Sequence, residues 1–208
     1  MLPFYKINTL EAGIDEAGRG SLIGDVYTSA VILPPDINFS VNDSKKLNAR
    51  KRLILKDYIE EYAIDYSVSH MSNNDIDKIN ILNATINSMH NAVKKLNVEP
   101  ELIIVDGNRF IPYYNENNQN IPHKCIIGGD AKYNSIAAAS ILAKVYHDKH
   151  IEELCDKYPI LDEYYDLYNN MGYGTKKHLD GINNYGVCEY HRKSYKSSFN
   201  KKNINIIH

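Results

Sequence analysis

The sequence lacks the cysteines that a disulfide framework or a zinc site would need. Its 208 residues contain three cysteines, Cys125, Cys155 and Cys188. Their number is odd, and none of them forms a Cys-x-x-Cys pair. A small domain held together by disulfides is therefore excluded, and we expect the protein to work in a reducing compartment.

Long apolar runs are missing as well. No segment approaches the ~20 apolar residues that a membrane-spanning helix requires. The N-terminal segment from Met1 to Leu10 has one lysine and no apolar stretch of the kind found in signal peptides. We expect a soluble protein of the cytoplasm with no membrane partner.

The average charge does not indicate a nucleic-acid partner, because the formal net charge is only -2 at pH 7. Basic residues nevertheless gather near the C-terminus, where seven lysines and arginines from Lys176 onward stand against Asp180 and Glu189. Such a segment is suited to follow a phosphate backbone, although a solvated helix face explains the same charges. With 43% apolar and 24% charged residues, the composition is that of an ordinary globular domain.

Hydrophobic periodicity predicts strands and helices in alternation. A helix is expected up to Tyr62, one long amphipathic helix from Ser72 to near Pro100, and further helices from about Tyr133 onward. The Asn-rich residues 115–120 are expected to form a flexible surface loop. Strands are predicted at 12–15, 26–33, 64–69, 102–105 and 125–127. This order indicates an α/β fold with a mixed, partly antiparallel sheet of five strands.

Acidic residues stand at the ends of three predicted strands. Asp15 and Glu16 precede a glycine-rich turn, Asp106 precedes Gly107, and Asp130 follows a third apolar run. Each taken alone is compatible with ordinary turn chemistry. Strand ends on one edge of a sheet converge, however, and four clustered carboxylates would repel one another unless cations were present. Hard oxygen ligands favour Mg²⁺ or Mn²⁺, and two such ions are typical of many nucleases.

Six sequence blocks resemble the ribonuclease HII family in order and spacing. They are AGIDEAGRG at 12–20, DSKKL at 43–47, IIVDG at 103–107, GGDAKYNSIAAASILAKV at 128–145, GYGTKKH at 172–178 and HRKSY at 191–195. The resemblance implies a ribonuclease H-like fold with a C-terminal helical extension. It also implies that the catalytic and metal-binding residues are Asp15, Glu16, Asp106 and Asp130.

By the same resemblance, the loop of Gly18, Arg19 and Gly20 contacts the nucleotide at the step from RNA to DNA. Tyr173 corresponds to the family tyrosine that senses the ribose hydroxyl. Further candidates for phosphate contacts are Lys45, Lys46, Lys144 and Arg192, for each of which a solvated side chain or a structural ion pair is an alternative.

Other conspicuous side chains favour a structural interpretation. Ser135 and Ser140 are small residues suited to close helix packing. A histidine such as His178 or His191 can shuttle protons near neutral pH, but Thr175 in GYGTKKH also reads as a helix cap, which favours a structural role for His178.

Five positions depart from the usual family pattern. Ser21 and Asp25 stand where prolines are common, Asn170 and Met171 replace a His-Lys pair, and His147 replaces an arginine. These changes leave the four carboxylates untouched, but they remove positive charge and put the rigidity of the loop after Arg19 in question. The chain lacks the additional N-terminal domain and the fourth-position glutamate of the related ribonuclease HIII type.

The sequence thus predicts an endoribonuclease that hydrolyses the RNA strand of RNA/DNA hybrids and incises 5′ of ribonucleotides in duplex DNA, leaving 3′-hydroxyl and 5′-phosphate ends. The rival hypotheses are a catalytically silent duplex-binding protein and another two-metal nuclease of the same fold. We expect a catalytic core at 1–150, a substrate-binding extension at 151–199 and a flexible tail at 200–208. The tail lacks a sliding-clamp peptide, and we expect a monomer.

Overall fold

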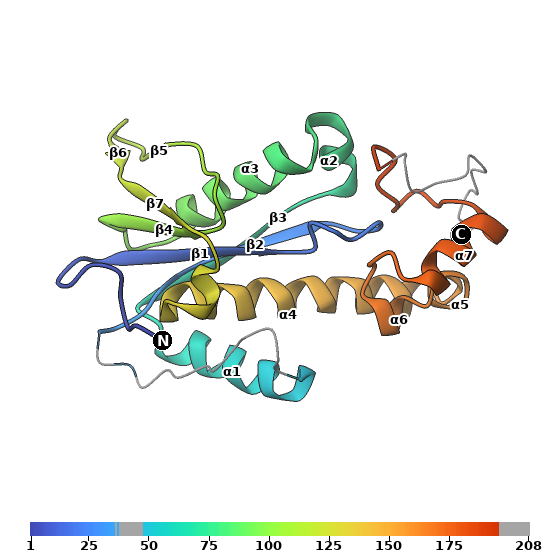
Figure 1. The fold of residues 1–208 in the computed structure, drawn as a ribbon, viewed down its shortest axis with the longest axis horizontal. Helices are drawn as coiled ribbons and strands as arrows, with labels where there is room; N and C mark the ends of the chain where they lie inside the picture. Colours follow the sequence, from blue (N-terminus) through green and yellow to red (C-terminus); the bar gives the residue numbers. More distant parts are fainter. Residues whose placement is uncertain (36, 38–47, 196–208) are drawn as a thin grey trace.

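The computed structural model describes residues 1–35, 37 and 48–195, and a mixed sheet forms the centre of the molecule (Figure 1). Its strand order is β3-β2-β1-β4-β7. The first three strands pair antiparallel, whereas β4 and β7 run parallel to β1. The strand bounds are β1 Glu11–Ala17, β2 Val26–Ile32, β3 Asp65–Met71, β4 Leu102–Asp106 and β7 His123–Ile126. The expectation of a mixed, partly antiparallel sheet is confirmed.

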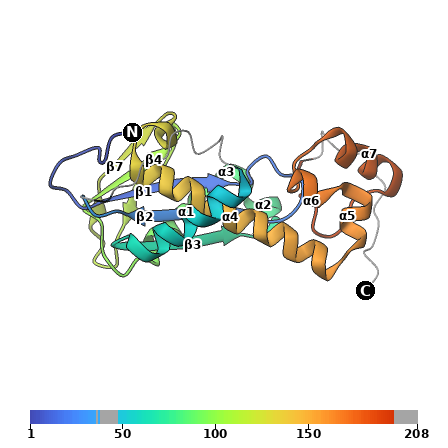
Figure 2. The ribbon, with the colours of Figure 1, turned by 90° about the horizontal axis from the view of Figure 1, so that it is seen from below.

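Helices cover both faces of this sheet (Figures 1 and 2). On one face lie α1 (Ala49–Tyr62) and α4 (Asn134–Lys157), and on the other lie α2 (Asn73–Ile79) and α3 (Ile81–Lys94). Strand alternation divides β1 between the two layers. Ile14 packs against Met89 and Val93 of α3, while Gly13 contacts the backbone of α4 at Ser135.

The single long helix expected from Ser72 to Pro100 is wrong, because the structure contains two helices that meet at Asn80. This residue has a φ of 66° and therefore interrupts the helical backbone. Its side chain accepts a hydrogen bond from the Asn83 amide and so caps α3. The apolar spacing continues across the break, which is why periodicity alone did not reveal it.

The expected flexible loop at 115–120 is instead the turn of a small hairpin. Strands β5 (Tyr113–Tyr114) and β6 (Asn120–Ile121) form a separate two-stranded sheet. The buried side chain of Asn115 accepts hydrogen bonds from the amides of Asn117 and Gln119. An asparagine that replaces backbone partners in this way orders a turn that composition alone classes as loose.

The C-terminal helices gather at the far end of α4 (Figure 1). They are α5 (Ile160–Tyr165), α6 (Leu167–Asn170) and α7 (Lys176–Tyr185), the last capped by Thr175 as expected. Their apolar side chains form a second core with Ile151, Leu154 and Cys155 of α4. The expected boundary at residue 150 therefore falls inside a continuous helix. The tail at 200–208 lies outside the described residues.

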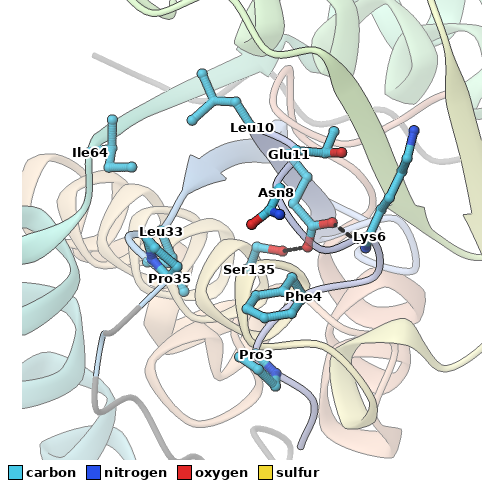
Figure 3. A pocket seen from close by; sticks show the side chains of 11 residues that line it. Pro3, Phe4, Lys6, Asn8, Leu10, Glu11, Leu33, Pro35, Ile64 and Ser135 are labelled. Atoms are coloured by element: carbon cyan, nitrogen blue, oxygen red, sulfur yellow. Dashed lines mark hydrogen bonds between the residues drawn. The ribbon is translucent and has the colours of Figure 1, made fainter.

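At the start of β1 the N-terminal segment is held by the carboxylate of Glu11. This carboxylate accepts hydrogen bonds from the amides of Tyr5 and Lys6. The side chain of Ser135 lies beside it, as Figure 3 shows. A pocket of about 260 Å³ opens here. Because these chain amides already use the carboxylate oxygens, we assign the group to anchoring the N-terminus.

All three cysteines are free, as the sequence predicts. Among the described residues, no helix combines the length and the apolar character needed to cross a bilayer.

Candidate active site

The carboxylates expected at the strand ends lie on neighbouring strands. Ile14 of β1 pairs in parallel register with Val105 of β4, so that Asp15 and Asp106 follow side by side. Both side chains project on the α4 side of the sheet, because Ile14 and Val105 point to the opposite layer. The parallel register thus sets the first two acidic groups next to each other.

Asp130 reaches the same edge through the turn after β7. It lies in a short 3₁₀ helix, Gly129–Ala131, immediately before α4, and it is 2% exposed. The preceding amide of Gly129 donates a hydrogen bond of 2.7 Å to Oδ1 of Asp106. The turn that carries Asp130 is therefore fastened directly to Asp106.

The buried position of Asp15 and the neighbouring negative charges change the pKa of its carboxyl group. Burial raises the pKa of its carboxyl well above the usual range, and the negative charges of Glu16 and Asp106 raise it further. Ser140 of α4 opposes this effect through a hydrogen bond to Asp15. Ser140 therefore contacts an acidic group as well as packing, a role that sequence reasoning did not assign to it.

An oxygen-rich, mutually repelling cluster fits a divalent cation, since a cation relieves the repulsion that burial strengthens. Across the described residues, no three His, Cys, Asp or Glu side chains are already arranged to hold a metal ion. Two of the carboxylates have partners within the chain: Asp106 accepts a hydrogen bond from the amide of Gly129, and Glu16 forms an ion pair of 3.0 Å with Arg19. Arg19 supplies the positive charge beside Glu16.

The Gly-Arg-Gly loop is shaped by close contacts on either side of Arg19. Gly18 has a φ of 83°, and a Cβ there would lie 2.3 Å from the ring of His147. At Gly20 a Cβ would lie 3.6 Å from the ring of Tyr173, an ordinary contact distance. The loop backbone thus passes directly beneath the tyrosine.

Tyr173 lies in the same pocket as the carboxylate of Glu16. This pocket measures about 240 Å³, and its walls also include Ser140 and Lys144 of α4 and Arg52 of α1. The amine of Lys144 lies 5.2 Å from the centre of the Tyr173 ring. The residue expected to read the ribose therefore adjoins one of the residues expected to catalyse.

Lys144 is also held in an ion pair, as its alternative interpretation predicts. Its amine lies 2.7 Å from Asp148, one helical turn further along α4. Arg52 points to the same carboxylate at 3.9 Å. Asp148 thus holds two basic side chains, those of Lys144 and Arg52, at the wall of the Tyr173 pocket. Sequence reasoning missed Arg52, because its nearness to α4 depends on how α1 packs.

Arg192 does not lie where a phosphate could reach it, and the expectation of a phosphate contact is corrected. Its side chain is fully buried, and its guanidinium donates to the backbone carbonyls of Arg19, Gly24 and Asp25. From the sequence alone, a basic residue in a basic segment is expected to lie at the surface, and only the structure shows that Arg192 is buried. Lys45 and Lys46 lie outside the described residues.

Two of the departures from the family pattern contact each other. The hydroxyl of Ser21 lies 3.2 Å from Nε2 of His147, whose Nδ1 lies 3.1 Å from Asp148. Ser21 is fully buried and donates to the carbonyl of Met171. The loop after Arg19 is therefore held to α4 and to Met171, the residue that follows α6, without proline.

The other departures are also engaged within the chain. Asp25 forms a 2.7 Å hydrogen bond with His70. The side chain of Asn170 donates to the carbonyl of Tyr165 and accepts from the amide of Gly172. These bonds shape the turn that leads into Tyr173.

His178 and His191 are both buried, which supports the structural interpretation of His178. Burial lowers the pKa of His178 to about 4 and that of His191 to about 3, the latter also because His178 is adjacent. Both are therefore neutral at pH 7.

As the pH is lowered from about 6.5, the free energy of unfolding is expected to decrease. In the unfolded chain these histidines bind protons at their ordinary pKa, whereas in the folded protein they do not. The stability that they contribute is complete above this pH and is lost as the pH falls toward about 4 and about 3. Each histidine contributes a slope of up to about 1.4 kcal/mol per pH unit. Urea unfolding from pH 7 to pH 4.5 measures it, and His191→Gln should remove about half of the slope of the pair. An unchanged slope in this variant would contradict the assignment.

Comparisons with known proteins identify the family of the chain. The family model described as Ribonuclease HII matches residues 12–202. The ribonuclease HII of Christiangramia forsetii is 52% identical over 197 residues, covering 94% of this chain and 95% of the relative. That of Parabacteroides distasonis is 47% identical over 196 residues, covering 94% of each chain.

Among solved structures, the ribonuclease H2 of Pyrococcus horikoshii superposes with a TM-score of 0.72 at 25% identity, covering 90% of this chain and 94% of that structure. This likeness confirms the expected fold class. Together with the family match, it means that the chain belongs to the ribonuclease HII family of metal-dependent endonucleases.

Proposed function

We propose that this protein incises the RNA-containing strand of a duplex on the 5′ side of a ribonucleotide, in RNA/DNA hybrids and in DNA that contains single ribonucleotides. The observation that carries this proposal is the shared pocket of Glu16 and Tyr173. It sets a group suited to recognise a ribose beside an acidic group suited to hold a cation. A duplex-binding protein without catalysis would not need buried, mutually repelling carboxylates.

The four carboxylates Asp15, Glu16, Asp106 and Asp130 are the residues that would hold Mg²⁺ or Mn²⁺, with two ions proposed. When bound, such ions supply activation of water and stabilisation of the leaving oxygen, which yields 3′-hydroxyl and 5′-phosphate ends. The residues of the chain orient the strand. Gly18 and Gly20 let the loop backbone approach the nucleotide, and Tyr173 stacks at the sugar.

Arg19 has a second part in this proposal. Its guanidinium forms an ion pair with Glu16. A cation at Glu16 would compete with this pairing, and the released guanidinium, which is half exposed, is then available to a phosphate of the bound strand. We further propose that the protein acts as a monomer in the cytoplasm, where its three free cysteines stay reduced.

The experiment offers three labelled duplexes with Mg²⁺ or with Mn²⁺: DNA with one embedded ribonucleotide, a continuous RNA/DNA hybrid and DNA alone. We expect incision of the first two, with the cut on the 5′ side of the ribonucleotide, and none of the third. Failure to cut either ribose-containing duplex would overturn the proposal. End-labelling of the products distinguishes 5′-phosphate from 5′-hydroxyl ends.

Replacing Tyr173 with alanine should reduce cutting at a single ribonucleotide by about tenfold, the scale of one stacking contact, and should reduce cutting of a continuous hybrid less. A single ribonucleotide offers one productive register, whereas a hybrid offers a ribose hydroxyl at every position. The measured quantity is the ratio of kcat/KM on the two substrates. Tyr168→Ala serves as the control, since Tyr168 is an exposed tyrosine on α6. An equal loss on both substrates would refute the reading role of Tyr173.

A further inference from the structure

The motif HRKSY at 191–195 supplies no side chain to the pocket of Glu16 and Tyr173. It nevertheless lies behind that pocket, because residues 21–24 run between it and the turn that carries Tyr173. Ser21 forms an antiparallel bridge with Tyr173, and Ile23 forms one with His191. Residues 21–24 thus join the Gly-Arg-Gly loop on one side to the C-terminal motif on the other.

Hydrogen bonds at His191 indicate the tautomers of two neutral histidines, His191 and His178. The backbone amide of Cys188 donates to Nδ1 of His191 at 3.0 Å, so Nδ1 carries no proton in a neutral ring. Its proton is then on Nε2, which lies 3.1 Å from Nε2 of His178. His178 must therefore accept at Nε2 and carry its own proton on Nδ1.

The contact at the other nitrogen of His178 tests this tautomer assignment independently. Nδ1 of His178 lies 3.1 Å from the carbonyl oxygen of Tyr173, and a carbonyl only accepts. A proton on Nδ1 is what this contact requires, so the two ends of the chain agree. Hydrogen bonds thus run in one direction from the Cys188 amide through His191 and His178 to Tyr173.

The backbone of Tyr173 is consequently held on both sides. Its carbonyl accepts from the amide of Thr175 as well as from His178, and its amide donates to the carbonyl of Asn170. Tyr165 packs its ring against both histidines and helps to exclude water from them. The ring of Tyr173 is left to face the pocket from a fixed backbone.

Arg192, the next residue, holds the backbone of the Gly-Arg-Gly loop. Its guanidinium donates to the carbonyl of Arg19 and to those of Gly24 and Asp25. Tyr195 adds a hydrogen bond from its hydroxyl to the same carbonyl of Arg19. His191 and Arg192 therefore hold, respectively, the turn that carries Tyr173 and the Gly-Arg-Gly loop, the two segments proposed to flank the nucleotide.

We propose that His191 and Arg192 are positioning residues that fix the spacing between the Gly-Arg-Gly loop and Tyr173, with His178 as the neutral link to Tyr173. This inference rests on the proposed function, because it assigns the spacing a task in recognising the ribonucleotide. Neither residue contacts the substrate. Their loss should impair the choice of cleavage position more than cleavage as such.

The first test needs neither substrate nor metal. Nitrogen-15 spectra of the full chain at pH 7 report which ring nitrogen of each histidine is protonated. We expect His191 protonated on Nε2 and His178 on Nδ1, with both rings neutral. The opposite tautomer at either residue, or a charged ring, would overturn the link.

The second test compares two substitutions at one site. His191→Gln retains an acceptor and a donor at the tip of the side chain, whereas His191→Leu retains neither. We expect His191→Leu to speed hydrogen exchange of the Tyr173 amide and to lower the preference for a single ribonucleotide over a continuous hybrid about tenfold. His191→Gln should restore both. Equal behaviour of the two variants, or an equal loss on both substrates, would overturn the positioning role.

These readouts separate the inference from the function on which it rests. If the wild-type protein cuts no ribose-containing duplex, the proposed function fails, while tautomers and amide exchange still decide whether His191 and His178 hold Tyr173. If the wild type cuts as expected but exchange at Tyr173 is the same in all three proteins, the positioning inference fails alone. Thermal unfolding of each variant identifies a protein that has failed to fold, in which case His178→Gln and His178→Leu provide the same comparison.

Discussion

Asp106→Asn is expected to reduce cleavage by about a thousandfold or more, because it removes one negative charge from the cluster that would hold the cations. The fold should be retained. Asparagine keeps a carbonyl oxygen that can accept the hydrogen bond from Gly129. Removing the charge also reduces the repulsion on Asp15, so the variant should melt no lower than the wild type.

Cleavage of a duplex with one ribonucleotide, measured under single-turnover conditions, gives the activity loss, and a gel-shift assay gives the affinity. Binding should change little, since the proposed contacts with the strand come from loop and pocket residues other than Asp106. Asp57→Asn is a suitable control, because it removes one carboxylate that is 77% exposed on α1. Retained cleavage by Asp106→Asn would place the metal site elsewhere.

Gly13→Ala is expected to produce a large loss of stability. An added Cβ would lie 2.2 Å from the carbonyl carbon of Ser135 and 2.4 Å from the amide nitrogen of Ile136. Both are backbone atoms of α4, which cannot rotate aside as a side chain can. We expect a cost at or above the upper end of the ~1–3 kcal/mol usual for an overpacked core, or a fall in Tm of roughly 6–12 °C.

Calorimetry or circular dichroism measures this change. Gly20→Ala is the matched control, because a Cβ there meets only the Tyr173 ring at 3.6 Å. It should melt close to the wild type. If Gly13→Ala also unfolds at the wild-type temperature, α4 packs less closely on β1 than the structure indicates.

The nearness of Asp15 and Asp106 could be predicted from sequence because each stands where an apolar strand ends. Strand alternation and parallel pairing then bring Asp15 and Asp106 together without further information. Asp130 is harder to place, since it depends on a turn fastened by the Gly129 amide. The proposed roles of Gly18, Gly20 and Tyr173 come from the resemblance to the family, because local patterns alone do not indicate them.

What the sequence could not predict depends on burial and on long-range packing. Arg192 has the composition of a surface contact, but the carbonyls that enclose it belong to residues 19–25. The break at Asn80 does not disturb the apolar spacing on either side. Arg52 and Ser140 reach the site only because α1 and α4 cover the same face of the sheet.

The uninterrupted course of α4 has a consequence for engineering. This one helix carries Ser140, which contacts Asp15, Lys144, which lines the Tyr173 pocket, and Cys155, which packs in the C-terminal core. The carboxylates, the Tyr173 pocket and the C-terminal core are thus connected by one unbroken helix, and a chimera with a relative's C-terminal part must keep α4 from a single parent. A junction at residue 150 would divide α4, whereas one at Tyr158, where the helix ends, keeps Ser140 and Lys144 on an α4 from one parent.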